Sequence, residues 1–192
     1  MEMPEVGSGY AEEVSLPSVL RTGVIVFLIS EAFLFGSLFW TYYYLRAMTP
    51  GWPPEHPSAT LAGINTVLLL TSSLAIWMGL RAIRAGDERG LARGLAATAI
   101  LGALFLVLTG REWAHEDFRP WTNAYGSTFY TLTGFHALHV FGGVVLMLVL
   151  LTRTLKHRFS ASNFLAVEAG SIYWHFVDVI WLFVFSTLFI VR

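Results

Sequence analysis

Five long runs of apolar residues, almost free of charge, dominate the sequence. They cover residues 19–44, 58–80, 94–110, 122–151 and 159–191. A helix crosses the hydrocarbon core of a bilayer with about 17–25 residues, so each run is long enough to span it. Each run is also much longer than a membrane strand, and inside lipid the backbone polar groups must be satisfied within the segment. The runs therefore predict an all-α integral membrane protein, built as a bundle of five transmembrane helices.

Composition agrees with a chain that lies mostly in lipid. Of its 192 residues, 55% are hydrophobic and only 13% are charged, whereas soluble domains average about 25% charged residues. The formal net charge of −1 provides no basic field, so we expect no nucleic-acid partner. The absence of cysteine excludes disulfides, iron–sulfur clusters, thiolate metal sites and cysteine catalysis from this chain.

The runs and the polar segments between them predict the domain organisation. We expect a polar N-terminal tail over residues 1–18, which lacks the basic start and short apolar core of a cleaved signal peptide. No repeat or linker divides the remainder, so residues 19–192 are expected to form one five-helix transmembrane domain. The expected helices are approximately 19–47, 58–83, 92–115, 122–152 and 162–191.

The distribution of lysine and arginine predicts the orientation, because cytoplasmic loops carry an excess of both. One side of the predicted bundle has eight such residues: Arg21, Arg81, Arg84, Arg89, Arg93, Arg153, Lys156 and Arg158. The other side has four: Arg46, Arg111, Arg119 and Arg192. The sequence therefore predicts a cytoplasmic N-terminus and a periplasmic C-terminus.

Aromatic residues gather at the predicted outer ends of the helices. They are Trp40, Tyr42, Tyr43, Tyr44, Trp52, Trp113 and Trp121. Tryptophan and tyrosine are enriched at membrane–water interfaces, so we expect these residues to form an interfacial belt.

Glu31 is an ionisable residue near the middle of the first run. It lies about 18 Å along the expected helix, where an ionised side chain costs at least roughly 2.5–3.5 kcal/mol. The favoured interpretation is a protonated carboxyl group that hydrogen-bonds to a neighbouring helix, because desolvation disfavours the ionised form. The alternative is a proton-relay site.

The last run contains three ionisable residues, Glu168, His175 and Asp178. At 100° per residue, one face of a helix can carry all three, and His175 and Asp178 at i and i+3 can pair directly. Interhelical hydrogen bonding within the bundle or toward a partner subunit is the favoured interpretation. A proton or cation path is the alternative.

His136 and His139 lie three residues apart in the fourth run, so they share a helix face. Hydrogen bonding across a packed interface is the favoured interpretation. Haem ligation would need a histidine on a facing helix at matching depth, and His175 is the one candidate inside another span.

Several segments, taken in order, resemble subunit III of the haem–copper terminal oxidases. These segments are residues 29–35 (ISEAFLF), 51–54 (GWPP), 64–66 (INT), 125–129 (YGSTF), 134–140 (GFHALHV) and the final stretch from Glu168 through 174–181 (WHFVDVIW). The resemblance covers about residues 20 to 190, and the last helix is its most specific part. Longer members of the family have seven helices, and this chain resembles the short five-helix form.

The resemblance implies a non-catalytic subunit of an aerobic respiratory complex. It implies no haem, copper or active site in this chain, with both cofactors in partner subunits and phospholipid bound in an internal cleft. Subunit I would be the main contact, subunit II would belong to the same complex, and the location would be the bacterial inner membrane. The family supports proton uptake and protects the catalytic subunit during turnover, in which oxygen is reduced to water and protons are translocated.

The resemblance also places this chain's polar residues. Glu31 matches the family's buried carboxyl group, and five others match its recurring polar positions. With Glu112 at the outer end of the third span, the expected structural or proton-relay set is Glu31, Glu112, His136, His139, Glu168, His175 and Asp178.

Other functions remain open at the level of the sequence. A related interpretation is a subunit III-like component of a quinol oxidase or nitric oxide reductase. A small haem-binding electron carrier would use His136 or His139 with His175. A stand-alone proton or ion transporter would use the polar residues as its path.

Overall fold

The computed structural model describes residues 16–55 and 57–191, which fold into five long helices. These are α1 (Leu16–Met48), α2 (Ala59–Arg84), α3 (Glu88–His115), α4 (Ala124–Leu155) and α5 (Leu165–Phe185), which continues as the short π-helix η1 (Ser186–Ile190). All five are long and apolar enough to cross a membrane, which confirms the predicted helical membrane bundle. A polar tail was expected over residues 1–18, and residues 1–15 of it lie outside the described part of the chain.

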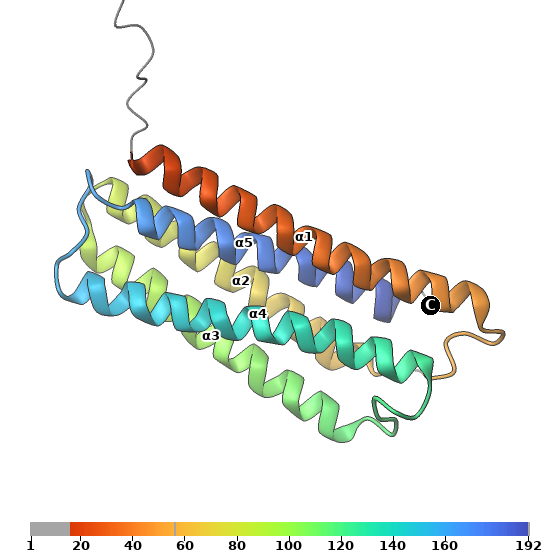
Figure 1. Ribbon diagram of the computed structural model, residues 1–192. Helices are drawn as coiled ribbons and strands as arrows, with labels where there is room; N and C mark the ends of the chain where they lie inside the picture. The colour runs from red at the N-terminus through yellow and green to blue at the C-terminus, as the bar shows by residue number, and fades with distance from the viewer. Residues whose placement is uncertain (1–15, 56, 192) are drawn as a thin grey trace, which may run out of the picture.

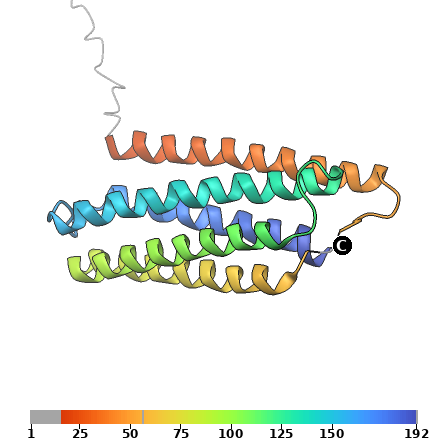
Figure 2. The ribbon, with the colours of Figure 1, turned by 90° about the horizontal axis from the view of Figure 1, so that it is seen from below.

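Successive helices run in opposite directions and are joined at alternating ends of the bundle (Figure 1). Helices α2 and α3 pack against each other along their length. Helix α3 also packs against α4, and α5 packs against both α2 and α4. Helix α1 packs against α4 and α5, on the side of the bundle away from α2 and α3 (Figure 2). The described chain therefore begins and finishes at opposite ends of the bundle.

Local sequence explains where two of the helices start. The Asp87 side chain accepts a 2.8 Å hydrogen bond from the backbone N–H of Gly90, and Asn123 does the same for Gly126. Aspartate and asparagine are favoured at this position because they satisfy a helix N–H that has no partner within the helix. These two caps begin α3 and α4.

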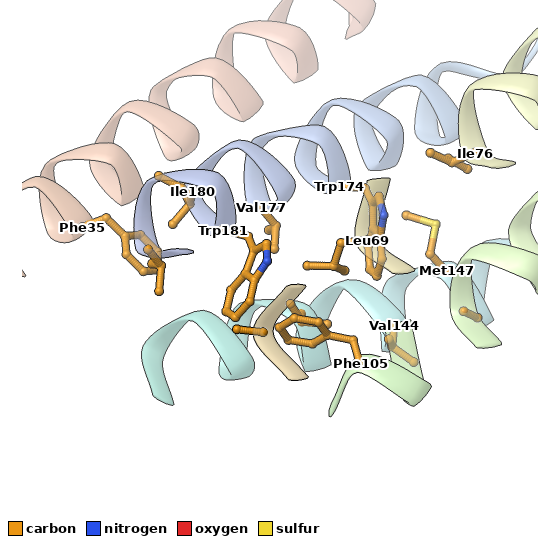
Figure 3. Packing of buried hydrophobic residues seen from close by; sticks show 14 of the residues in the cluster. Phe35, Leu69, Ile76, Phe105, Val144, Met147, Trp174, Val177, Ile180 and Trp181 are labelled. Carbon is orange, nitrogen blue, oxygen red and sulfur yellow. The ribbon is translucent and has the colours of Figure 1, made fainter. Parts of the chain in front are cut away.

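The core is built around two tryptophans of α5, Trp174 and Trp181, which are almost fully buried (Figure 3). The Trp174 ring lies against Gly102 of α3 and Gly143 of α4, where a Cβ atom would come within 2.6 and 2.7 Å of ring carbons. Trp181 packs edge-on against Phe105, with ring centroids 4.8 Å apart. Because Gly102 and Gly143 lack side chains, α3 and α4 can approach Trp174 closely, and α5 packs at the centre of the bundle.

The aromatic belt differs in part from the prediction. Trp40 and Trp121 are 73% and 82% exposed, as belt residues should be, but Tyr42 is only 1% exposed. Trp52 packs over Tyr42 with a centroid separation of 5.3 Å, and its indole N–H donates to the Tyr42 hydroxyl. The α1–α2 loop thus folds back across the end of the bundle, so Tyr42 belongs to an internal aromatic cluster.

Candidate functional site

Glu31 and His139 form the polar contact between α1 and α4. The Glu31 carboxylate lies 2.8 Å from Nε2 of His139, and the two side chains are 18% and 14% exposed. The other ring nitrogen, Nδ1, lies 2.7 Å from the carbonyl oxygen of Phe135. Tyr173 of α5 donates its hydroxyl to the His139 carbonyl oxygen at 2.9 Å. This contact therefore joins three helices through a chain of hydrogen bonds.

His175 and Asp178 meet at Ser73, in the middle of α2. Nδ1 of His175 lies 2.8 Å from the Ser73 hydroxyl, which donates its own hydrogen to Asp178. The direct His175–Asp178 pair that the sequence allows is not among the hydrogen bonds of residues 16–55 and 57–191. The Ser73 hydroxyl lies between the two side chains, and its hydrogen bonds connect α5 to α2 at mid-depth.

Glu168 lies in the first turn of α5, where it links two arginines. Its carboxylate oxygens lie 3.0 Å from Arg21 of α1 and 3.3 Å from Arg84 of α2. Both arginines are at least half exposed. Glu168 therefore joins the ends of three helices near the polar boundary, and lies apart from His175 and Asp178 despite sharing their helix.

His136 is fully buried among aromatic rings. Its ring lies 5.0 Å from the Trp181 ring and 5.5 Å from the Phe105 ring, measured between centroids. Neither ring nitrogen has a hydrogen-bond partner among the described residues. His136 is therefore a packing residue of the core and does not share the contact that His139 makes with Glu31.

Glu112 is buried in α3, 3% exposed, and its Oε1 atom has no hydrogen-bond partner among the described residues. One turn closer to the middle of α3, Thr109 accepts a 3.3 Å hydrogen bond from the amide of Asn65 in α2. Beyond Glu112, Glu116 lies outside the span, and burial raises the pKa of its carboxyl group. Glu112 thus lies near the C-terminal end of α3, one turn beyond the hydrogen bond that joins α3 to α2.

Three of the ring nitrogens that could ligate a metal are hydrogen-bonded instead. Both nitrogens of His139 are engaged, and Nδ1 of His175 is engaged by Ser73. His136 is fully buried, with the Trp181 and Phe105 rings packed around it. Within the described ranges, no group of three or more His, Cys, Asp or Glu side chains is placed to hold a metal ion.

A groove of about 750 Å³ opens between α1, α4 and α5. Its wall is mainly apolar and includes Phe27, Leu146 and Tyr173, while Arg153 and Asn163 lie at the end nearest the α4–α5 turn. The Arg153 guanidinium also lies 5.4 Å from the centre of the Phe159 ring. An apolar trough that ends in a cation is suited to an amphipathic molecule with an anionic head.

Three hydroxyl groups of α2 organise the polar contacts, and sequence reasoning foresaw Thr66 as a hydrogen-bond partner but missed Ser72 and Ser73. Ser73 joins His175 to Asp178, Thr66 accepts from the Trp181 indole at 2.9 Å, and Ser72 accepts from Trp174 at the same distance. A signal was available, because all three hydroxyls lie in the uncharged second run. The partner of each one depends on helix rotation, which the sequence alone does not provide.

Comparison with known proteins places these features in one family. The family model described as cytochrome c oxidase subunit III matches residues 8–191. The chain is 41% identical over 177 residues to "Cytochrome c oxidase subunit 3" of Thermostichus vulcanus, covering 91% of this chain and 88% of that protein. It is 40% identical to a "Probable cytochrome c oxidase subunit 3" of Nocardia farcinica, covering 92% and 90%. The horse protein, "Cytochrome c oxidase subunit 3", is 38% identical, covering 88% and 69%.

Proposed function

The chain belongs to the cytochrome c oxidase subunit III family, a non-catalytic subunit of haem–copper oxidases, and we propose that it stabilises the catalytic subunit and supports its proton uptake and turnover. The observation that carries the proposal is the family match across residues 8–191. The complex would reduce oxygen to water and translocate protons. The reaction would take place in subunit I, which would hold the haem and copper and make the main contact, with subunit II in the same assembly.

The polar residues of the bundle support this structural role. Glu31, Glu168, His175 and Asp178 each contact a side chain of another helix. A continuous relay would need polar groups in succession across the membrane, whereas these contacts lie on separate helix pairs. The set Glu31, Glu112, His136, His139, Glu168, His175 and Asp178 is accordingly proposed to fix helix packing, with the Glu31–His139 contact protecting the complex during turnover.

The groove between α1, α4 and α5 is proposed to hold a phospholipid. Its apolar wall matches acyl chains, and Arg153 with Asn163 at one end matches a phosphate group. Native mass spectrometry of the purified complex should show bound phospholipid, and Arg153→Ala should reduce it severalfold. Unchanged lipid content in that variant would argue against the groove as the binding site.

The proposed location is a bacterial inner membrane, with the N-terminus cytoplasmic and the C-terminus periplasmic. Multi-pass insertion follows from the five spanning helices. The orientation is supported by the excess of arginine and lysine at the helix ends that flank the α2–α3 and α4–α5 turns, and in the α4–α5 turn itself. Accessibility of tags placed at the two termini of the chain in intact cells would test it.

Purification of the tagged chain in mild detergent tests the proposed function. We expect a haem–copper subunit to co-purify in about equal amount, and the haem absorption to remain with that subunit when the two are separated. A Soret band that stays with this chain would instead support an electron carrier. Recovery of the chain without any haem–copper subunit, or proton flux in liposomes that contain this chain alone, would contradict the proposal.

A further inference from the structure

One face of α5 is directed away from the bundle and contains a histidine. Ile172, Val179 and Phe183 are 45%, 49% and 60% exposed, and the half-buried His175 lies between the first two along the helix. These four residues, here called the α5 face, recur every three or four positions. Such a spacing forms a single stripe on a helix, of the kind that packs against another helix.

The histidine of this face lies deep in the membrane. It comes ten residues after Leu165, where α5 begins, which places it about 15 Å from that end at 1.5 Å per residue. Ser73, its hydrogen-bond partner, is near the middle of α2 as well. Acyl chains offer no hydrogen bond at this depth, and a polar group left unsatisfied there costs several kcal/mol.

The hydrogen bonds of the cluster determine which group His175 presents outward. The Ser73 hydroxyl has one hydrogen, and it donates that hydrogen to Asp178. With Asp178 ionised, and so able only to accept, the Ser73 oxygen accepts from Nδ1–H of His175, 2.8 Å away. In a neutral imidazole the second nitrogen, Nε2, is then an acceptor. Among the described residues no hydrogen bond to Nε2 is present, so the α5 face presents an acceptor that needs a donor.

The surroundings of the face fit a helix rather than a lipid. A hollow of about 160 Å³ adjoins Ile172, between α1 and α5, with Val24, Ile25 and Ala169 in its wall and Arg21 with Glu168 at its end. It has the size to receive one protruding side chain. A lipid headgroup would stay near the Arg21 end, roughly 15 Å from the middle of the span. A second copy docked through the same face would bring two acceptors together.

We propose that the α5 face is the docking surface for a transmembrane helix of the catalytic haem–copper subunit, and that this helix donates a hydrogen bond to Nε2 of His175. The donor is a hydroxyl, amide or indole N–H at mid-depth. The inference rests on the proposed function, since it specifies where that partner binds. It also makes His175 a residue of the interface, held in the correct tautomer by Ser73 and Asp178.

Site-specific photo-crosslinking in native membranes tests the surface. A benzophenone amino acid replaces Val179 in one variant and Ile100 in the control. Ile100 is 67% exposed at mid-depth of α3 and lies outside the α5 face. We expect the probe at 179 to form an adduct with the haem-carrying subunit, identified by mass spectrometry, at least about tenfold more than the probe at 100.

The outcomes separate the docking surface from the function. Adducts at 179 that contain only lipid, a second copy of this chain or any other polypeptide overturn the docking surface, even when the chain co-purifies with the oxidase. Strong adducts of the haem-carrying subunit at 100 and none at 179 overturn it too. Failure of the chain to co-purify with any haem–copper subunit contradicts the proposed function instead, and the adducts at 179 then still report what covers the face.

Substitution of His175 tests the hydrogen bond itself. Hydrogen bonds between membrane helices average about 0.6 kcal/mol and reach about 1.7, so His175→Leu should weaken retention of the catalytic subunit by roughly threefold to twentyfold in a detergent-dilution assay. His175→Gln keeps an amide oxygen that can accept, and should restore most of the retention. Equal retention in wild type and both variants would contradict the predicted donor. Equal loss in both variants, with unchanged thermal stability of the separated chain, would do so as well.

Discussion

Helices α1 and α5 are both long and apolar enough to span a membrane, yet they are integrated into the bundle in opposite ways. Half of the most apolar 18-residue window of α5 is buried, compared with 6% for α1. Helix α5 contributes Trp174 and Trp181 to the core, whereas α1 contributes mainly Phe35 and Tyr42. Apolar packing holds α5 in place, while α1 depends on a few contacts.

The polar contacts of α1 lie at three depths, beside aromatic contacts such as Phe27 with Tyr173 and Phe39 with Phe183. Arg21 pairs with Glu168 at one end, Glu31 with His139 near the middle, and Tyr43 with Thr187 toward the other end. The comparison teaches that hydrophobicity alone does not place a helix in a membrane bundle, because lipid is as apolar as the core. The packing of two buried tryptophans dominates the placement of α5, whereas the placement of α1 depends more on its polar contacts.

The largest expected effect comes from emptying the space that Trp174 fills. Trp174→Ala leaves a cavity between Gly102 and Gly143 and should lower the free energy of unfolding by about 3–5 kcal/mol. Trp40→Ala, at a 73% exposed position of α1, is the matched control and should change it by less than about 0.5 kcal/mol. Denaturation of the purified complex in detergent measures both, and similar losses would refute the contrast between α1 and α5.

A smaller effect is expected where the helices approach Trp174. In Gly143→Ala the added methyl group would lie 2.7 Å from ring carbons of Trp174, and overpacking of this kind costs about 1–3 kcal/mol. At Gly134 on the same helix, an added methyl group would meet no other atom within 4 Å among the described residues, so Gly134→Ala should be neutral or slightly stabilising. A thermal shift of the same sign and size in both variants would show that close packing around Trp174 is not what positions α5.

Five long apolar runs were enough to predict the helices, because a bilayer allows few other structures for such segments. The bundle interior was harder to foresee. Nothing in the sequence says that Tyr42 turns inward while Tyr44 stays 53% exposed, since both suit the membrane interface. The difference arises from the α1–α2 loop, which brings Trp52 over Tyr42.

The polar set shows the same limit. The presence of Glu31, His139, His175 and Asp178 in membrane spans indicates that they need partners, and this much is readable from the sequence. Which partner each one finds depends on the rotation of two helices about their axes. The pairing of Glu31 with His139, and the insertion of Ser73 between His175 and Asp178, are therefore products of packing.

Removing the middle contact of α1 should loosen that helix without unfolding the bundle. Glu31→Ala leaves Nε2 of His139 without its partner, at a cost of about 0.6–1.7 kcal/mol. We expect the complex to assemble and its initial rate to be retained, but its activity to decay roughly threefold to twentyfold faster during turnover. Glu31→Gln can still hydrogen-bond to His139 and serves as the control. Decay kinetics unchanged from wild type in Glu31→Ala would contradict a protective role for this contact.

The smallest effect is expected at Glu168 of α5, which forms two similar ion pairs, one with Arg21 of the weakly packed α1 and one with Arg84 of α2. Arg21 and Arg84 are 63% and 50% exposed, and exposed pairs contribute about 0–1 kcal/mol. Arg84→Ala should be nearly silent, because α2 remains held to α5 by the hydrogen bonds of Trp174 and Trp181. Arg21→Ala should increase proteolysis and hydrogen exchange at the start of α1 by up to about fivefold, more at low salt, where the pair is least screened. Equal exchange in the two variants would mean that α1 is held at this end by packing, and would remove one of the three polar contacts on which the contrast with α5 depends.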